Sequence, residues 1–197
     1  MTCFFLLQDR LISVRGEKFL KFLKIQRDDL EQILTWRTSE FVTRYMYTDV
    51  EYDLGKQEKW FESIQRDETS KYWILELKGK KFGLVSINDI DLRHKRGSWA
   101  FYVGEPEMSM VAGLIGPHLY NYVFTQIGFH KLYGEVMKEN EAVRNIHIKH
   151  GCRELGFHAD HVYKYDRFHD VYVYEMLASA WEEKGKKFHR YMPSVEE

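Results

Sequence analysis

The chain has very little cysteine and almost no net charge, and each of these features excludes some kinds of site or binding partner. Cys3 and Cys152 are its two cysteines among 197 residues, and they lie far apart with no spacing typical of a metal site. The formal net charge is −1, which gives no electrostatic reason to expect a nucleic-acid or membrane partner. We therefore expect a reduced, cytoplasmic protein.

The start of the chain also lacks a run long enough to span a membrane. The apolar stretch CFFLLQ is short, and Asp9 and Arg10 interrupt it. It has neither a basic leader nor a small-residue cleavage site, so it does not have the pattern of a secretory signal. We expect residues 1–13 to form an N-terminal arm or an edge strand.

Apolar and aromatic residues are plentiful by contrast. Hydrophobic residues make up 44% of the chain and aromatic residues 16%, which is the composition of a globular protein. The length fits one domain with a substantial core, and no internal repeat is apparent. We place this domain at residues 14–178 and expect a polar C-terminal tail, 179–197, that is frayed at its end.

Apolar periodicity and turn residues predict an ordered series of strands and helices. Asp28 and Asp29 open the first helix, and the Gly-containing turn 78–80 joins two strands as a hairpin. The order is α+β, with a mixed sheet covered by helices. The predicted strands are 18–25, 72–77, 81–90, 98–103, 132–137, 156–165 and 171–177, and the predicted helices begin near 28, 54, 113 and 141, with a loop or broken helix at 41–49.

The most informative stretch is 132–152, which reads LYGEVMKENEAVRNIHIKHGC. A short apolar strand runs through Asn140, which caps a helix that ends at Gly151. This pattern resembles the end of the acyl-CoA site in GNAT N-acetyltransferases. His147 and Cys152 stand where that family usually has Tyr and Phe. The resemblance implies a GNAT fold: a mixed, mostly antiparallel sheet with helices on both faces and a V-shaped split between the fourth and fifth strands.

The resemblance also implies acetyl-CoA as co-substrate, bound in that split. The fourth strand would pair with the pantetheine arm, and the next helix would offer its N-terminal N–H groups to the pyrophosphate. The family's glycine loop is not cleanly present, because the chain reads MSMVAGLIGP there, and its two glycines equally suit close helix packing. The expected cofactor-binding residues are Phe101, Tyr102, Val103, Ala112, Gly113, Leu114, Gly116 and Asn140.

The N-terminal half resembles acetyltransferases of nucleotide-sugar pathways, especially those of pseudaminic acid biosynthesis that acetylate a UDP-linked 4-amino sugar. The matching points include Asp29-Leu30-Glu31, Trp36-Arg37, Met46-Tyr47, Trp60-Phe61, Gly83 with Ser86, and Glu135-Val136-Met137. A guanidinium can bind phosphate oxygens bidentately, and Met and Tyr can cover a uracil ring. The resemblance thus implies an acceptor site of Arg37, Met46, Tyr47 and Ser86, although ion pairing and core packing are the ordinary roles of these residue types.

Two residues are candidates for proton transfer. Glu135 stands in an otherwise apolar strand, where a carboxylate is costly to bury, and it could accept the proton of the acceptor amine or orient its ammonium. His147 could protonate the departing thiolate, since imidazolium titrates near neutrality. Chance placement is the alternative for His147, because the chain has nine histidines. The histidines show no zinc-ligand pattern, so we predict no metal.

Two other readings of the function remain open at this level. The Trp-Arg pair and the general layout are shared with ribosomal-protein alanine acetyltransferases, which would bind a peptide. The imperfect glycine loop would also suit an acyl-CoA-binding module without turnover. The sequence leaves the acceptor and a homodimer undecided.

Overall fold

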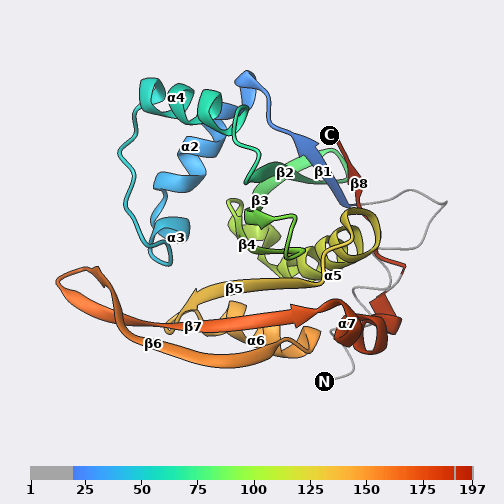
Figure 1. Ribbon diagram of the computed structural model, residues 1–197. Coiled ribbons are helices and arrows are strands. Elements are labelled where there is room, and N and C mark those ends of the chain that lie inside the picture. The colour runs from blue at the N-terminus through green and yellow to red at the C-terminus, as the bar shows by residue number, and fades with distance from the viewer. Residues whose placement is uncertain (1–19, 189, 197) are drawn as a thin grey trace.

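The computed structural model describes residues 20–188 and 190–196, and the expected N-terminal arm lies outside these residues. The described strands form one sheet in the order β6-β7-β5-β4-β3-β2-β1-β8 (Figure 1). The strands are β1 Leu20–Lys24, β2 Lys71–Leu77, β3 Lys80–Asp91, β4 Arg96–Val103, β5 Lys131–Met137, β6 Arg153–Lys164, β7 Arg167–Leu177 and β8 Ser194–Val195.

The helices follow the predicted order, with short additions. The predicted loop 41–49 begins as a one-turn helix, and the predicted helix 113–127 ends as a π turn before Gly128. The α-helices are α2 Leu30–Thr38, α3 Glu40–Thr43, α4 Leu54–Ile64, α5 Ala112–Tyr122, α6 Glu141–His150 and α7 Ala178–Lys184. The shorter helical turns are η1 Arg27–Asp29, η2 Pro106–Val111, η3 Val123–Ile127 and η4 Gly185–Phe188.

The V-shaped split expected between the fourth and fifth strands is confirmed. β4 and β5 run parallel and pair only at their first residues, Arg96–Ser98 with Lys131–Tyr133. The strands then diverge beside Trp99, whose buried ring packs on Tyr120 and His147. Gly134 faces Trp99 on β5, and a Cβ there would already lie 3.3 Å from the carbonyl oxygen of Trp99. An aromatic wedge therefore holds the two strands apart.

Helices cover both faces of the sheet, as expected. On one face, α2 packs with Ile74 of β2 and Leu84 of β3, and Trp60 of α4 lies against this cluster. On the other face, the buried residues of α5 join Phe22 and Trp99 in the larger core. Figure 1 shows α2–α4 on one side of the split and the β6-β7 hairpin on the other. The two sides of the split share this larger core, which also contains Leu132 of β5 and Met176 of β7.

The described part of the C-terminal segment, up to Glu196, packs against the domain, which differs from the frayed end expected from the sequence. β8 pairs in parallel with β1, with Ser194 opposite Lys21. Trp181 of α7 is buried, stacks on Phe188, and donates from Nε1 to Oδ1 of Asn121 at 2.8 Å. These contacts could not be predicted from local sequence patterns, because they join segments that are far apart in the chain.

Candidate active site

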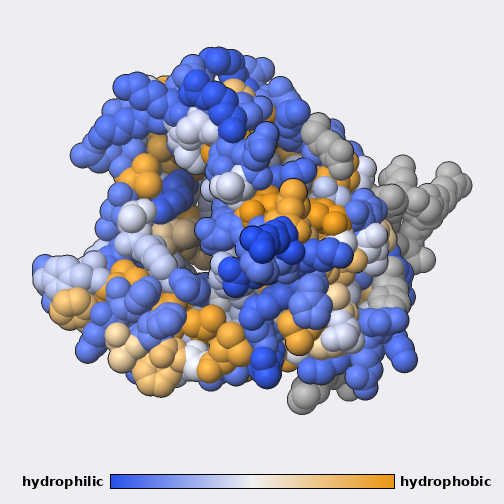
Figure 2. Space-filling model, in the orientation of Figure 1, coloured by the Kyte–Doolittle hydropathy of each residue, from blue (hydrophilic) through white to orange (hydrophobic). Residues whose placement is uncertain are grey.

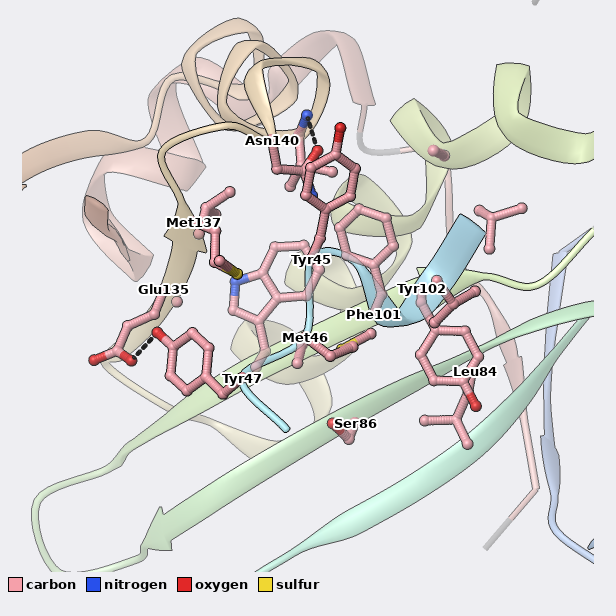
Figure 3. Close-up of a pocket in the computed structure, with 18 of the residues that line it drawn as sticks. Tyr45, Met46, Tyr47, Leu84, Ser86, Phe101, Tyr102, Glu135, Met137 and Asn140 are labelled. Atoms are coloured by element: carbon pink, nitrogen blue, oxygen red, sulfur yellow. Dashed lines mark hydrogen bonds between the residues drawn. The ribbon is translucent and has the colours of Figure 1, made fainter. Parts of the chain in front are cut away.

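A cavity of about 700 Å³ occupies the split and continues across the sheet face beneath the loop that follows α3. Figure 2 shows the molecule hollowed between the α2–α4 side and the β6-β7 hairpin, and Figure 3 shows side chains of several strands pointing into this space. We refer to it as the cleft. Expected cofactor-binding residues that line it are Phe101, Tyr102, Val103, Ala112 and Asn140.

The backbone of β4 has one open edge in the cleft. Its other edge pairs with β3 from Val103 to Ser98, whereas its pairing with β5 stops at Ser98. Unpaired backbone N–H and C=O groups require partners, and an extended amide-containing chain can supply them as an added strand. Asn140 lies across the split and caps α6 by accepting from the N–H of Val143 at 3.4 Å. The geometry therefore fits the pantetheine arm of acetyl-CoA.

Three expected cofactor residues lie outside the cleft. Leu114 is buried in the core, and the carbonyl of Gly113 accepts a 2.9 Å hydrogen bond from Nε2 of His150. A Cβ on Gly116 would lie 2.8 Å from the same imidazole ring. Gly116 therefore serves the close packing of α5 on α6, which was the alternative for this loop. The cleft is reached instead by Ser109 and Ala112, where η2 runs directly into α5.

Glu135 and Tyr47 meet at the other end of the cleft. Tyr47 donates from its hydroxyl to Oε2 of Glu135 at 2.7 Å, as the dashed line in Figure 3 marks. Glu135 is exposed, so the sequence argument from the cost of burying it does not hold. The buried Ser86 and the partly buried Met46 line the same space. The expected acceptor residues are thus brought together, but around a solvated carboxylate.

Arg37 lines the cleft, but its guanidinium forms hydrogen bonds with the loop that covers the cleft. It donates to the carbonyl of Thr48 at 2.8 Å, to the Thr48 hydroxyl at 3.1 Å and to Oγ1 of Thr43 at 3.4 Å. Burial lowers the pKa of Arg37 from its ordinary value, and the nearby Asp49 opposes that shift. Its hydrogen bonds therefore order the loop, which the sequence did not reveal.

A second carboxylate in the cleft was missed by the sequence. Asp89 lies at an irregularity of β3, where the register shifts between Asn88 and Asp91 and the φ of Asp89 is +51°. Such a bulge re-aims a side chain from its strand. Asp89 accepts from Oγ of Ser98 at 2.8 Å and from the hydroxyl of Tyr133 at 3.4 Å. A polar Asn-Asp pair within an apolar strand was the signal that could have found it.

His147 lines the cleft as a buried, neutral ring. It stacks on Tyr174 with 5.0 Å between ring centroids and meets Trp99 edge to face at 5.3 Å. Burial lowers the pKa of His147 to about 3, with a smaller contribution from His150. The imidazole is therefore unprotonated near pH 7, and the expected imidazolium acid would not be present there.

Neither a group of metal-ligating side chains nor a membrane-spanning helix is present among the described residues. No three His, Cys, Asp or Glu side chains in residues 20–188 and 190–196 are grouped so that they could hold a metal ion. None of the helices in this part of the chain is both long and apolar enough to cross a membrane.

Comparison with known proteins identifies the family to which the chain belongs. Residues 20–153 match the model of the acetyltransferase (GNAT) domain. Over 139 residues the chain is 27% identical to the spermidine N(1)-acetyltransferase of Escherichia coli (strain K12), a match that spans 70% of this chain and 72% of that protein.

Solved structures show the same fold. The crystal structure of spermidine N-acetyltransferase from Vibrio cholerae in complex with CoA and spermine aligns with a TM-score of 0.78 and 20% identity, over 84% of this chain and 99% of that chain. A chimera of the Vibrio cholerae enzyme and hSSAT aligns with a TM-score of 0.75 and 21% identity, over 83% and 98%. These relatives are named for spermidine acetylation, and none of them for the nucleotide-sugar chemistry that the sequence led us to expect.

Proposed function

The chain belongs to the GNAT acetyltransferase family and is an acetyl-CoA-dependent N-acetyltransferase, and we propose that its acceptor is a small cationic amine of the polyamine type. The named relatives act on spermidine, which supports this class of acceptor. The cleft supports it independently, through the charges that are left without partners.

The observation that carries the proposal is the state of four charged side chains lining the cleft. Glu135 and Asp89 accept only hydroxyl hydrogen bonds, and within the described residues neither has a basic partner at ion-pair distance. Among the described residues the two arginines form no ion pair either, but Arg37 already donates to the loop, and Arg44 lies over the rings of Phe41 and Tyr45. Unpaired carboxylates attract ammonium groups and repel phosphates.

The two carboxylates suit an acceptor with more than one amine. Ser98 of β4 pairs with Tyr133 of β5, and Tyr133 bridges toward Asp89. Glu135 stands two residues further along β5 on the same face, roughly 7 Å from Tyr133 by strand geometry. We propose that Glu135 holds the reacting amine and Asp89 a second ammonium at the far end of a short methylene chain.

The proposed reaction uses the open edge of β4 and the Glu135 carboxylate. Acetyl-CoA supplies an activated acetyl group as its thioester. A backbone N–H of β4 polarises the thioester carbonyl, as oxyanion-binding donors do. Glu135 takes the proton of the bound ammonium, directly or through water, because a neutral amine is required for attack. His147 remains neutral and shapes the wall of the cleft, so the departing sulfur takes its proton from water.

The nucleotide-sugar acceptor is the second candidate. Met46, Tyr47 and Ser86 line the cleft as that reading requires, so the apolar surface for a base is present. The cationic partner for its diphosphate is weaker, because Arg37 already holds Thr43 and Thr48. We therefore place it below the polyamine and retain it as a measurable alternative.

An acceptor panel tests the proposal. Spermidine, a UDP-linked 4-amino sugar and a peptide with N-terminal alanine are each incubated with acetyl-CoA, and both thiol release and the mass of the acetylated product are measured. Spermidine is expected to give the highest kcat/KM. Glu135→Gln should then lower turnover by roughly 10²–10⁴-fold, the range typical of a lost acid–base group. Higher kcat/KM with the nucleotide sugar or the peptide would overturn the assignment.

A further inference from the structure

Lys164, the last residue of β6, has its side chain in an unusual place. The side chain is 3% exposed and reaches beneath the loop that follows α3, 121 positions earlier in the chain. Its Nζ donates to the carbonyl of Thr43 at 2.7 Å, to that of Met46 at 3.0 Å and to Oδ1 of Asp49 at 2.7 Å. These three acceptors use all three protons of the ammonium group.

A buried ammonium is costly unless it is paired and hydrogen-bonded, and this one is both. Two of its partners are backbone carbonyls in the segment 43–49, which we call the acceptor loop. Asp49, whose side chain is 60% exposed, also accepts from Oγ1 of Thr43 at 2.8 Å. The hydrogen bond from Lys164, followed by that from Thr43, lowers the pKa of Asp49. The Lys164–Asp49 ion pair thus links the two ends of the acceptor loop, because Lys164 also binds the carbonyl of Thr43.

The hairpin end of this contact is fixed as well. Nε2 of His169 in β7 donates to the carbonyl of Lys164 at 3.0 Å, and Nδ1 of the same ring lies 2.9 Å from Oε1 of Glu139. Arg37 binds Thr43 and Thr48 from the α2 side. The acceptor loop is therefore held from two directions, and it carries Tyr47, whose hydroxyl binds Glu135.

We propose that Lys164 is a positioning residue: it fixes the acceptor loop so that Tyr47 meets Glu135, and thereby sets the affinity for the acceptor amine. The carboxylate role on which this rests is that of the proposed function. The ordering of the loop does not depend on the acceptor's identity. Lys164 itself touches no reacting atom.

The test compares Lys164→Met with Lys21→Met, which removes an ion pair of the same 2.7 Å length with Glu76 on β1 and β2. Hydrogen exchange of the peptide covering 43–49 is measured alongside KM and kcat for acceptor and acetyl-CoA. Lys164→Met should speed exchange in the acceptor loop and raise the acceptor KM by about 10-fold, the loss expected for one strong charge-assisted contact. In Lys164→Met the KM for acetyl-CoA should change less than the KM for the acceptor. In Lys21→Met both KM values should stay at the parental level.

Asp49→Asn provides a second variant, because it removes the exposed carboxylate without emptying the buried site. It should shift loop exchange and acceptor KM in the same direction by a smaller factor. Parental exchange in the acceptor loop of both variants would overturn the positioning role, whichever acceptor is used. Faster exchange with an unchanged acceptor KM would overturn its link to affinity. A failure of the proposed function would appear instead as a higher kcat/KM of the parent protein for the nucleotide sugar or the peptide than for spermidine.

Discussion

The hydroxyl of Tyr47 and the carboxylate of Glu135 form a hydrogen bond of 2.7 Å between residues 88 positions apart in the chain. Burial, followed by this contact, raises the pKa of Tyr47 well above its ordinary value, so the phenol stays protonated near neutral pH. The phenol donates to Oε2 of Glu135, and within the described residues Glu135 has no basic side chain at ion-pair distance. The acceptor end of the cleft therefore presents a carboxylate that is oriented but not neutralised.

Tyr47→Phe should raise the acceptor KM by about 5-fold, since roughly 1 kcal/mol is typical of a single lost hydrogen bond. The carboxylate would lose its orientation but keep its charge, so kcat should fall less than kcat/KM. Steady-state kinetics at saturating acetyl-CoA measure this. Tyr52→Phe is the matched control, because its hydroxyl also donates to a glutamate, Glu31 at 3.4 Å, outside the residues that line the cleft. Equal effects in both variants would argue against a specific role for Tyr47.

His147→Phe should retain turnover within a few-fold and keep the alkaline limb of the pH–rate profile. The reason is that burial lowers the pKa of His147 to about 3, so no imidazolium exists to be lost near neutrality. A phenyl ring preserves the packing on Trp99 and Tyr174. The pH dependence of kcat checks this, and disappearance of the alkaline limb in the variant would restore His147 as the acid.

The free energy of unfolding should fall as the pH drops below about 6.5, which is the ordinary pKa of histidine. Burial lowers the pKa of His118 to about 4, of His147 to about 3 and of His150 to about 4. Between those values and 6.5 the unfolded chain binds protons that the folded chain does not, so the free energy of unfolding rises with pH in that window. Each histidine contributes about 1.4 kcal/mol per pH unit to the slope.

Urea unfolding at pH 7, 6 and 5 measures that slope. His147→Phe should reduce it by about one proton. A slope that is the same in His147→Phe as in the parent would contradict the neutral, buried state of this ring.

Gly116→Ala should destabilise the fold without weakening acetyl-CoA binding. The new Cβ would lie 2.8 Å from the ring of His150, and overpacking of this kind costs about 1–3 kcal/mol. Ser109→Trp should weaken acetyl-CoA binding without destabilising the fold, because Ser109 is exposed and lines the cleft. Thermal unfolding and acetyl-CoA titration of both variants give the comparison. Weakened acetyl-CoA binding in Gly116→Ala would return this glycine to the cofactor site.

The sequence predicted those parts of the fold that rest on local patterns. The strand and helix order, the Asn140 cap and the split all follow from apolar periodicity, capping residues and the family resemblance. It failed at the C-terminal segment, because the partners of Trp181 and β8 lie far away in the chain. Periodicity reports which face is buried, but not against which distant segment.

The site was predicted less completely for the same reason. Glu135, Met46, Tyr47 and Ser86 do gather in the cleft, but the partners that define their roles are distant in sequence. Asp89 enters the cleft through a strand irregularity, and Lys164 reaches the acceptor loop across 121 positions. Arg37 was expected to bind phosphate because guanidinium commonly does, whereas three of its five N–H groups already donate to the loop. Residue type suggested the chemistry, but only the three-dimensional arrangement shows which groups remain unpaired.

The most direct test of the account is the effect of Asp89→Asn on two acceptors that differ in their number of ammonium groups. Spermidine, with three amines, and hexylamine, with one, are compared by kcat/KM with acetyl-CoA saturating. If Asp89 holds a second ammonium, the variant should lower kcat/KM for spermidine by about 10-fold and leave that for hexylamine nearly unchanged. The same loss for both amines, or none for either, would contradict a cleft in which two unpaired carboxylates select a cationic acceptor.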